Sequence, residues 1–215
     1  MPLSYDAAAR TLTISTVGTT YQMKIDEYGY LLHLYYGARA EGDLSYLVTY
    51  CDRSGMCGCP HDVADRTYSL DVLPQEFPFQ GSGDMRSPAL LVRDAEGTFG
   101  CDLRYKCHEI RPGKYALPGL PAVYADAEAD GAETLSVTLA DERLGLEVEL
   151  LYGVLPKLDV ITRAAIVRNN GGGVVTVEKL QSACLDFVTG DLDVITFDGR
   201  HAMERRPTRR HLQNG

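Results

Sequence analysis

Short alternations of apolar and polar residues recur along the chain, and they constrain its fold more than any other feature. Arg10–Ser15 and Thr20–Ile25 alternate in this way on either side of a Val17-Gly18 turn signal, and Leu146–Leu150 alternates strictly. Side chains of a β-strand point alternately to opposite faces of a sheet, so each segment predicts a strand with one buried face. No long segment has helical periodicity, and only Leu44–Tyr50 could form a short turn of helix.

Turn residues join such segments into hairpins. Two pairs of predicted strands flank turn sequences: Leu135–Leu139 with Leu146–Leu150, and Val160–Val167 with Val174–Val177. The turns are Asp141–Gly145 and Asn169–Gly173. Strands at short spacing, separated by Gly, Pro, Asn and Asp, indicate a sandwich. We therefore expect an all-β fold of two packed antiparallel sheets with few short helices, formed by residues 1–215 as a single domain.

Charge and composition exclude several classes of partner. The 30 acidic and 21 basic residues give a formal net charge of −9, which repels nucleic acid. No stretch reaches the roughly 18 apolar residues that span a bilayer, and Met1-Pro2-Leu3 lacks the features of a signal peptide. Six cysteines without an export signal fit reduced thiols. We expect a cytoplasmic protein with neither a membrane nor a nucleic-acid partner.

A cysteine-rich loop contains the most conspicuous candidate ligands, Cys51, Cys57, Cys59 and His61. Three thiolates and an imidazole could hold zinc tetrahedrally, but structural sites usually separate paired ligands by two to four residues. The single residue between Cys57 and Cys59 therefore favours free or partly buried thiols. A bond between Cys51 and Cys57 is the alternative under oxidising conditions. We expect no metal and no cofactor.

Two further motifs predict structural roles. Cys101 and Cys107 would share one face of an extended strand about 20 Å apart, too far for one metal, so we expect small apolar side chains on a strand. The glycine-rich stretch around Asp84 and Arg86 lacks the Gly-Lys-Ser/Thr ending of a phosphate loop. Asp84 and Arg86 could form a local ion pair or face a partner. We favour a shaped loop that enters a strand at Ala89–Val92.

Asp52, Asp65 and Arg66 lie on either side of the cysteine loop. A carboxylate that accepts and a guanidinium that donates in a fixed fork would suit a polyhydroxylated ligand. Taken alone, such residues are more often surface ion pairs. The chain marks no carboxylate pair for glycoside hydrolysis, no Gly-x-Ser-x-Gly elbow and no His-Glu-x-x-His helix. No catalytic residue is assigned.

Many short motifs in register support a resemblance that covers nearly the whole chain. They are Gly29–Gly37, Asp65–Asp71, Gln75–Pro78, Gly83–Ala89, Asp102–Lys106, Gly113-Lys114, Leu117–Ala122, Glu133–Leu135, Gly145–Val148, Asp159–Arg163 and Gly199–Arg205. On these motifs the chain resembles the N-terminal domain of glycoside hydrolase family 36, the bacterial α-galactosidases. The resemblance implies a β-supersandwich that precedes a (β/α)₈ barrel carrying both catalytic aspartates.

No segment of these 215 residues resembles that barrel, and Arg205–Gly215 closes no recognisable element. The resemblance therefore implies a non-catalytic part of a retaining α-galactosidase that acts on melibiose- or raffinose-like sugars. In tetrameric members of the family, a loop of this domain closes the galactose pocket of the neighbouring subunit. Asp52 and Arg66 match residues of that loop, and Asp52 is expected to bind sugar hydroxyls. Cys57-Gly58-Cys59 departs from the family pattern, which is rich in Ser and Pro there.

Two other functions stay open at this point. A free-standing carbohydrate-binding module would present exposed aromatic rings, and the chain has 13 Tyr but no Trp. A small zinc protein would be built around the cysteine-rich loop. The expected partners under the family interpretation are an α-galactoside and further copies of the chain, as a homo-tetramer in the full-length form.

Overall fold

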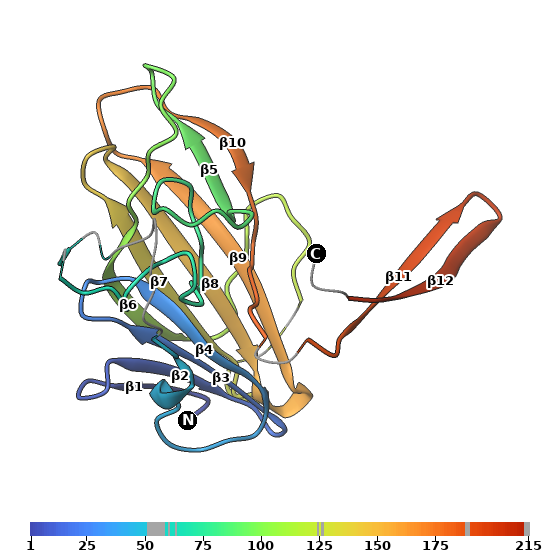
Figure 1. Ribbon diagram of the computed structural model, residues 1–215. Coiled ribbons are helices and arrows are strands. Elements are labelled where there is room, and N and C mark those ends of the chain that lie inside the picture. The colour runs from blue at the N-terminus through green and yellow to red at the C-terminus, as the bar shows by residue number, and fades with distance from the viewer. Residues whose placement is uncertain are drawn as a thin grey trace. The chain divides into compact units, whose positions relative to one another are not determined.

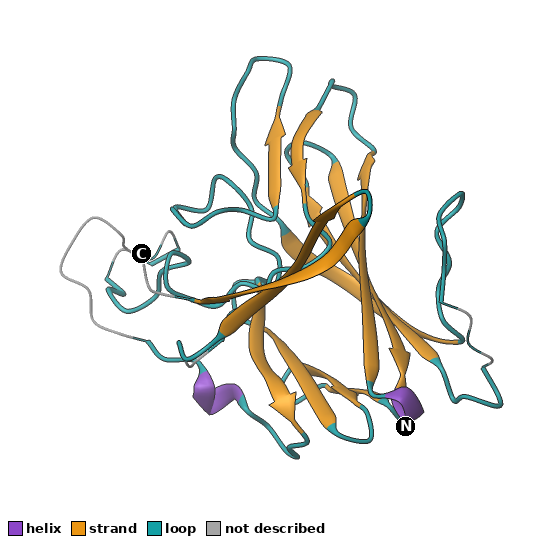
Figure 2. Ribbon diagram, turned by 90° about the vertical axis from the view of Figure 1, so that its right-hand side faces the viewer, coloured by secondary structure: helices purple, strands orange, loops and turns teal. Residues whose placement is uncertain are grey.

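The computed structural model describes residues 1–50, 59, 61–62, 64–123, 125, 127–187 and 190–212. Strands dominate this part of the chain, with two short 3-10 helices (Figure 2). The chain divides into two compact units, Met1–Leu185 and Asp186–Gly215. The predicted all-β class is confirmed, whereas a single sandwich domain over residues 1–215 stays a prediction. No helix among the described residues is long and apolar enough to cross a membrane.

The first sheet has four antiparallel strands in the order β1-β2-β3-β4 (Figure 1). They are β1 Leu3–Asp6, β2 Thr11–Ser15, β3 Thr19–Ile25 and β4 Leu31–Ala38. The hairpin predicted around Val17-Gly18 is β2–β3, and its register pairs Leu12 with Met23. The predicted turn of helix is η1, a 3-10 helix over Ser45–Leu47.

The second sheet also has four antiparallel strands, in the order β6-β7-β8-β9. They are β6 Arg104–Pro112, β7 Glu133–Asp141, β8 Leu146–Leu155 and β9 Val160–Asn169, and the 3-10 helix η2 covers Pro156–Leu158. The predicted hairpin around Asp141–Gly145 is β7–β8, in which Asp141 pairs with Leu146. The four strands stand in sequence order, with short connections between β7, β8 and β9 and a longer one, residues 113–132, between β6 and β7.

One hydrophobic core joins the inner faces of the two sheets. Leu12 and Ile14 of β2 are completely buried, as are Val148 and Leu150 of β8, and all four belong to the same cluster. Their spacing of two residues reproduces the alternation in the sequence, because the intervening side chains point to the other face. Apolar burial of this kind contributes about 25 cal/mol per Å² of buried area. The prediction of two packed sheets is confirmed.

A third, two-stranded sheet corrects one predicted hairpin. It pairs β5 Leu90–Arg93 with β10 Thr176–Leu180, and its register matches Leu90 with Leu180. The predicted pairing of Val160–Val167 with Val174–Val177 is therefore wrong, because β9 pairs with β8 instead. The reason is that the chain leaves the second sheet at the glycines that follow β9 and enters the third sheet at β10. A Cβ on Gly171 would lie 2.3 Å from the carbonyl oxygen of Leu144, so only glycine allows this close approach.

The second unit contains a single hairpin, formed by β11 Asp193–Arg200 and β12 Met203–His211. The expectation that Arg205–Gly215 closes no recognisable element is wrong, since Arg206 pairs with Asp198 in this ladder. Ala202, in the connecting turn, has a φ of 65°. A strand with four arginines and a proline carries little of the usual signal for a strand, which explains the error.

Candidate functional site

The structure places Arg66 on the surface, in the segment between η1 and β5. Its neighbour Asp65 accepts hydrogen bonds from the hydroxyl and the backbone N–H of Thr67, at 2.7 and 2.8 Å, and these bonds lower the pKa of Asp65. Two residues after Arg66, Tyr68 is buried and anchors the segment. Asp52 lies outside the described residues, so its position relative to Arg66 stays a prediction.

Five rings form an aromatic platform beside this segment. They are Tyr28, Tyr30, Tyr50, His61 and Tyr68. His61 stacks on Tyr28 with ring centroids 4.4 Å apart, and Tyr28 meets Tyr68 edge-on at 4.8 Å. Tyr50 is 49% exposed, so part of the platform faces solvent. Exposed rings with polar tips are a common surface for sugar rings.

Asp26 holds the aromatic platform in place through hydrogen bonds. This buried carboxylate accepts hydrogen bonds from the backbone N–H groups of Tyr28 and Tyr30, at 3.0 and 2.7 Å. It also accepts one from the hydroxyl of Tyr68. Burial and this bond to Asp26 raise the pKa of Tyr68 far above its ordinary value, so Tyr68 is a permanent donor. The turn between β3 and β4 is thereby tied to the segment that carries Arg66.

Arg104 and Asp102 extend the platform with a planar ion pair. The Nε and Nη2 atoms of Arg104 each donate to Asp102 at 2.9 Å, and its guanidinium lies 3.9 Å from the centre of the Tyr30 ring. The hydroxyl of Tyr30 donates to Asp102 at 3.1 Å. Arg104 Nη2 also lies 3.4 Å from Nε2 of His61. A bidentate pair stacked on a ring holds both charged groups in one orientation.

Beside this ion pair lies a cleft of about 780 Å³. Its lining includes Asp102, Arg104, Asp141 and Arg143, together with the buried Cys101. Small-molecule sites usually occupy about 300–1,000 Å³. The balanced charges suit a neutral ligand rich in hydroxyl groups better than a strongly charged one. Asp102 and Arg104 line the cleft and also contact the platform, and the platform and the cleft together form the candidate site.

The structure differs from the prediction that Cys101 and Cys107 share one face of a strand. Cys101 is buried but precedes β6, whereas Cys107 lies within β6 and is exposed. A register shift between Tyr105 and Cys107 changes the side-chain alternation, so equal parity no longer means a common face. Burial and the neighbouring Asp141 raise the pKa of Cys101 well above its ordinary value. The expectation of two small apolar side chains on one strand is therefore wrong for this pair.

The zinc hypothesis concerns residues that are only partly described. Cys51 and Cys57 lie outside the described residues, whereas Cys59 is a buried free thiol and His61 belongs to the platform. No group of three His, Cys, Asp or Glu side chains in the described part of the chain could hold a metal ion. The hydrogen bond to Cys59, together with burial, raises the pKa of Tyr28 to about 12. Cys59 thus packs against the platform.

The structural interpretation of the glycine-rich stretch is confirmed. Arg86 Nη2 lies 2.8 Å from Asp84, whose side chain is almost fully buried. The same nitrogen donates to the carbonyl oxygens of Leu70 and Leu73, at 3.1 and 2.7 Å. Asp84 also accepts from Gln75 at 2.9 Å. The pair therefore ties the loop before β5 to the segment that follows Arg66.

A buried polar cluster in the core was not predicted from the sequence. Glu76, completely buried, accepts hydrogen bonds of 2.7 Å from the hydroxyls of Tyr21 and Tyr152. It also lies 3.0 Å from Nδ1 of His33 and 2.9 Å from Nη1 of Arg163. Tyr21 and His33 come from the first sheet, and Tyr152 and Arg163 from the second. The cluster therefore joins both sheets through one carboxylate.

The electrostatics of the cluster keep Glu76 ionised. Burial alone would raise its pKa, but the cation of Arg163 and the hydrogen bond from His33 outweigh burial, and the pKa lies below its ordinary value. Nε and Nη2 of Arg163 and Nε2 of His33 are buried without a partner among the described residues. The donors of the cluster thus outnumber its acceptors. His33, Glu76 and Arg163 each lie within one of the short family motifs, which is the only sequence signal that marks them.

The fold and the site define a β-sandwich domain whose surface groups suit hydroxyl-rich ligands. No catalytic nucleophile is assigned among its described residues. The chain belongs to glycosyl hydrolase family 36, because the sequence pattern of the family's N-terminal domain matches residues 29–215. It is 50% identical over 216 residues to the bifunctional α-galactosidase/sucrose kinase AgaSK of Mediterraneibacter gnavus, covering 100% of this chain and 23% of AgaSK.

Solved structures agree with this assignment. The galactosidase domain of AgaSK matches with a TM-score of 0.93 at 50% identity, over 99% of this chain and 29% of that one. The α-galactosidase AgaA variant A355E D548N of Geobacillus stearothermophilus, in complex with raffinose, matches with a TM-score of 0.89 at 39% identity, over 95% and 28%. The chain therefore spans less than a third of the length of these relatives.

Proposed function

We propose that this chain is the non-catalytic N-terminal sandwich of a retaining α-galactosidase, and that the full-length protein hydrolyses terminal α-galactosides such as melibiose and raffinose. The observation that carries this proposal is the match of the whole chain to less than a third of relatives named α-galactosidases. The remainder of such a protein has room for a catalytic barrel. The bound raffinose of the AgaA complex supports the substrate class.

The second part of the proposal is that Asp52 and Arg66 help to close the galactose pocket of a neighbouring subunit. Arg66 is exposed on a segment that Asp65 and Tyr68 hold in place. A guanidinium offers several donors in a fixed fork and a carboxylate accepts two or more bonds, so the two can bind adjacent sugar hydroxyls. This role implies a homo-oligomer, which we propose to be a tetramer in the full-length form.

A chimaera tests both parts. This chain would replace the matching region of AgaSK, and the kinetics of raffinose hydrolysis would be measured. The isolated chain should release no nitrophenol from a nitrophenyl α-galactoside, whereas the chimaera should turn over raffinose. Arg66→Ala in the chimaera should raise KM about tenfold, as expected for the loss of a hydrogen bond from a charged donor.

A matched control is Arg93→Ala, because Arg93 is also an arginine with a partly exposed side chain but pairs with Glu178 across the β5–β10 sheet. It should leave KM unchanged. Equal effects of the two variants would contradict the role of Arg66. Turnover by the isolated chain that survives repurification would contradict the non-catalytic assignment.

The isolated chain also separates this proposal from a free-standing carbohydrate-binding module. Millimolar raffinose should leave the amide resonances of the isolated chain unchanged, because the proposed pocket needs a neighbouring subunit. Shifts confined to the platform and cleft, around Tyr30 and Arg104, would instead favour a module that binds sugar by itself. We propose a cytoplasmic location, supported by the free thiols of Cys59, Cys101 and Cys107.

A further inference from the structure

Arg66 lies at the corner of a turn that its own neighbours close. The backbone N–H groups of Thr67, at 2.8 Å, and of Tyr68 donate to the carboxylate of Asp65, which thereby spans Arg66. On the other side, the N–H of Cys59 donates to the carbonyl of Asp65 at 3.3 Å. An Asp side chain that accepts from the backbone two residues on is a common way to build a turn. These bonds shape the turn, but its position relative to the sheets depends on the residues that anchor it.

Tyr68 attaches the turn to the first sheet. Its side chain is 1% exposed, and its hydroxyl donates to the buried carboxylate of Asp26, the residue that directly follows β3. Asp26 is oriented independently of Tyr68, because it also accepts from the backbone N–H groups of Tyr28 and Tyr30. A single charged hydrogen bond therefore connects the β3–β4 turn to a point two residues from Arg66.

Loss of that bond would be felt at the Arg66 turn and not in the sheet. One oxygen of Asp26 accepts from the two backbone N–H groups and the other from Tyr68. Without the hydroxyl of Tyr68, the second oxygen would lose its donor, and a buried acceptor without a donor is costly. The sheet cannot relieve this cost, because its own hydrogen bonds hold Asp26 in place. The surface turn that carries Arg66 has fewer constraints and would shift.

We propose that Tyr68 and Asp26 are positioning residues for Arg66, and that the bond between them sets the place from which the Arg66 guanidinium reaches a sugar. This role rests on the proposed function, since it assumes that Arg66 donates to an α-galactoside. Both positioning side chains are buried and act through Arg66 without touching the sugar. A binding group contributes most when it is held in its binding geometry before the ligand arrives, because less freedom is then lost on binding.

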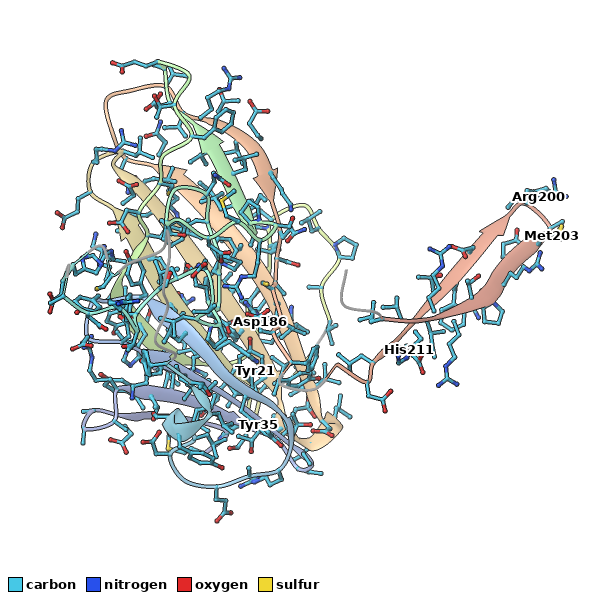
Figure 3. All side chains as sticks on the ribbon, in the orientation of Figure 1. Tyr21, Tyr35, Asp186, Arg200, Met203 and His211 are labelled. Carbon is cyan, nitrogen blue, oxygen red and sulfur yellow. The ribbon has the colours of Figure 1, made fainter. Side chains whose placement is uncertain are left out.

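Tyr152 offers a matched comparison. Its hydroxyl is also buried and donates to a buried carboxylate, that of Glu76 at 2.7 Å, in the core cluster that contains Tyr21 (labelled in Figure 3). This bond joins the second sheet to the core and does not involve the Arg66 turn. Tyr68→Phe and Tyr152→Phe therefore remove the same chemical group from similar surroundings, and they differ in what the lost bond holds.

Raffinose kinetics in the chimaera with AgaSK test the role. Tyr68→Phe should raise KM about three- to tenfold, up to the change expected for Arg66→Ala. It should leave kcat within about twofold, as expected for binding that is equal in the ground state and the transition state. Tyr152→Phe should leave KM within about twofold. In an Arg66→Ala background, Tyr68→Phe should raise KM no further, because a residue that acts through Arg66 cannot remove the same interaction twice. Equal effects of the two Phe variants would overturn the inference, as would effects of Tyr68→Phe and Arg66→Ala that add.

Asp26→Asn is a second variant at the other end of the bond. It keeps the size of the side chain and an acceptor for the two backbone N–H groups, but a neutral amide bonds the hydroxyl of Tyr68 less strongly than a carboxylate does. Its KM should therefore lie between that of the unmodified chimaera and that of Tyr68→Phe. A KM unchanged in both variants, in a chimaera where Arg66→Ala raises it, would overturn the inference and leave the proposed function standing. A KM unchanged by Arg66→Ala would count against the proposed function itself.

Amide hydrogen exchange on this chain, without sugar, measures the positioning directly. The amides of Thr67 and Tyr68 should exchange at least about tenfold faster in Tyr68→Phe than in Tyr152→Phe, since the turn then opens more readily. Amides of β7 and β8 should exchange no faster in Tyr68→Phe than in Tyr152→Phe, which separates a local effect from a general loss of stability. Equal protection of the turn in the two variants would overturn the inference whatever the kinetics show.

Discussion

Arg163 Nη1 lies 2.9 Å from Glu76 Oε1, and this ion pair links the edge strand β9 to the segment that precedes β5. That segment is itself bonded to the first sheet, since the N–H of Glu76 donates to the carbonyl of Leu31 at 2.9 Å. The pair therefore holds three parts of the sandwich together at one buried point. A buried ion pair adds little net stability, but the loss of one partner is costly because the other charge stays buried.

Glu76→Gln should destabilise the sandwich by about 3–5 kcal/mol, the cost of leaving a buried charge without its partner. Arg163 would lose its carboxylate while its remaining donors stay buried. Urea unfolding, monitored by tyrosine fluorescence, measures the free energy of unfolding. Glu178→Gln removes the half-exposed partner of Arg93 and should cost less than about 1 kcal/mol. If Glu76→Gln lowers the free energy of unfolding no more than Glu178→Gln does, charge does not stabilise the cluster.

The same carboxylate predicts a pH dependence. Its pKa in the folded protein lies below the ordinary value of 4.5, so the stability that it contributes is complete above about pH 4.5. That contribution is lost as the pH falls through the folded pKa, because protonation is less costly in the unfolded chain. The difference in unfolding free energy between the unmodified protein and Glu76→Gln should therefore shrink below pH 4.5. A difference that grows with acidity would contradict this sign.

Gly171→Ala should destabilise the sandwich by about 1–3 kcal/mol, because its Cβ would lie 2.3 Å from a backbone oxygen that cannot move independently. Gly172→Ala is the matched control in the same turn, since nothing lies within 4 Å of a Cβ there. It should stay within about 0.5 kcal/mol of the unmodified protein. Thermal unfolding of both variants under identical conditions decides the comparison. Similar midpoints for the two would show that the turn adjusts around the methyl group.

The sequence predicted the sandwich because strand alternation is a local signal, and β2, β3, β7 and β8 appear where that signal is clean. The pairing of β5 with β10 is a contact between segments more than 80 residues apart, and no local pattern specifies it. Glu76 and Arg163 were missed for a related reason. Charged residues are rarely buried unless they are paired, and the pairing is visible only in three dimensions. Arg66 lies on the surface, and its role at a sugar stays a prediction, because no local pattern shows what a surface arginine binds.

The cysteine-rich loop is not expected to bind zinc. The chain purified from a zinc-containing medium should hold less than about 0.1 zinc per molecule, well below the stoichiometry of a structural site. Nε2 of His61 lies 3.4 Å from the guanidinium of Arg104, and a fixed cation at that distance opposes a second one. Elemental analysis after gel filtration gives the ratio, and a chelator should leave the unfolding midpoint unchanged. Arg104→Ala is the control. This variant removes the cation but keeps the unfavourable spacing of Cys57 and Cys59, so it should also hold no zinc. One zinc per chain that a chelator removes, together with a fall in the unfolding midpoint, would show that the cysteine-rich loop is a metal site. His61 would then have to leave its contact with Arg104.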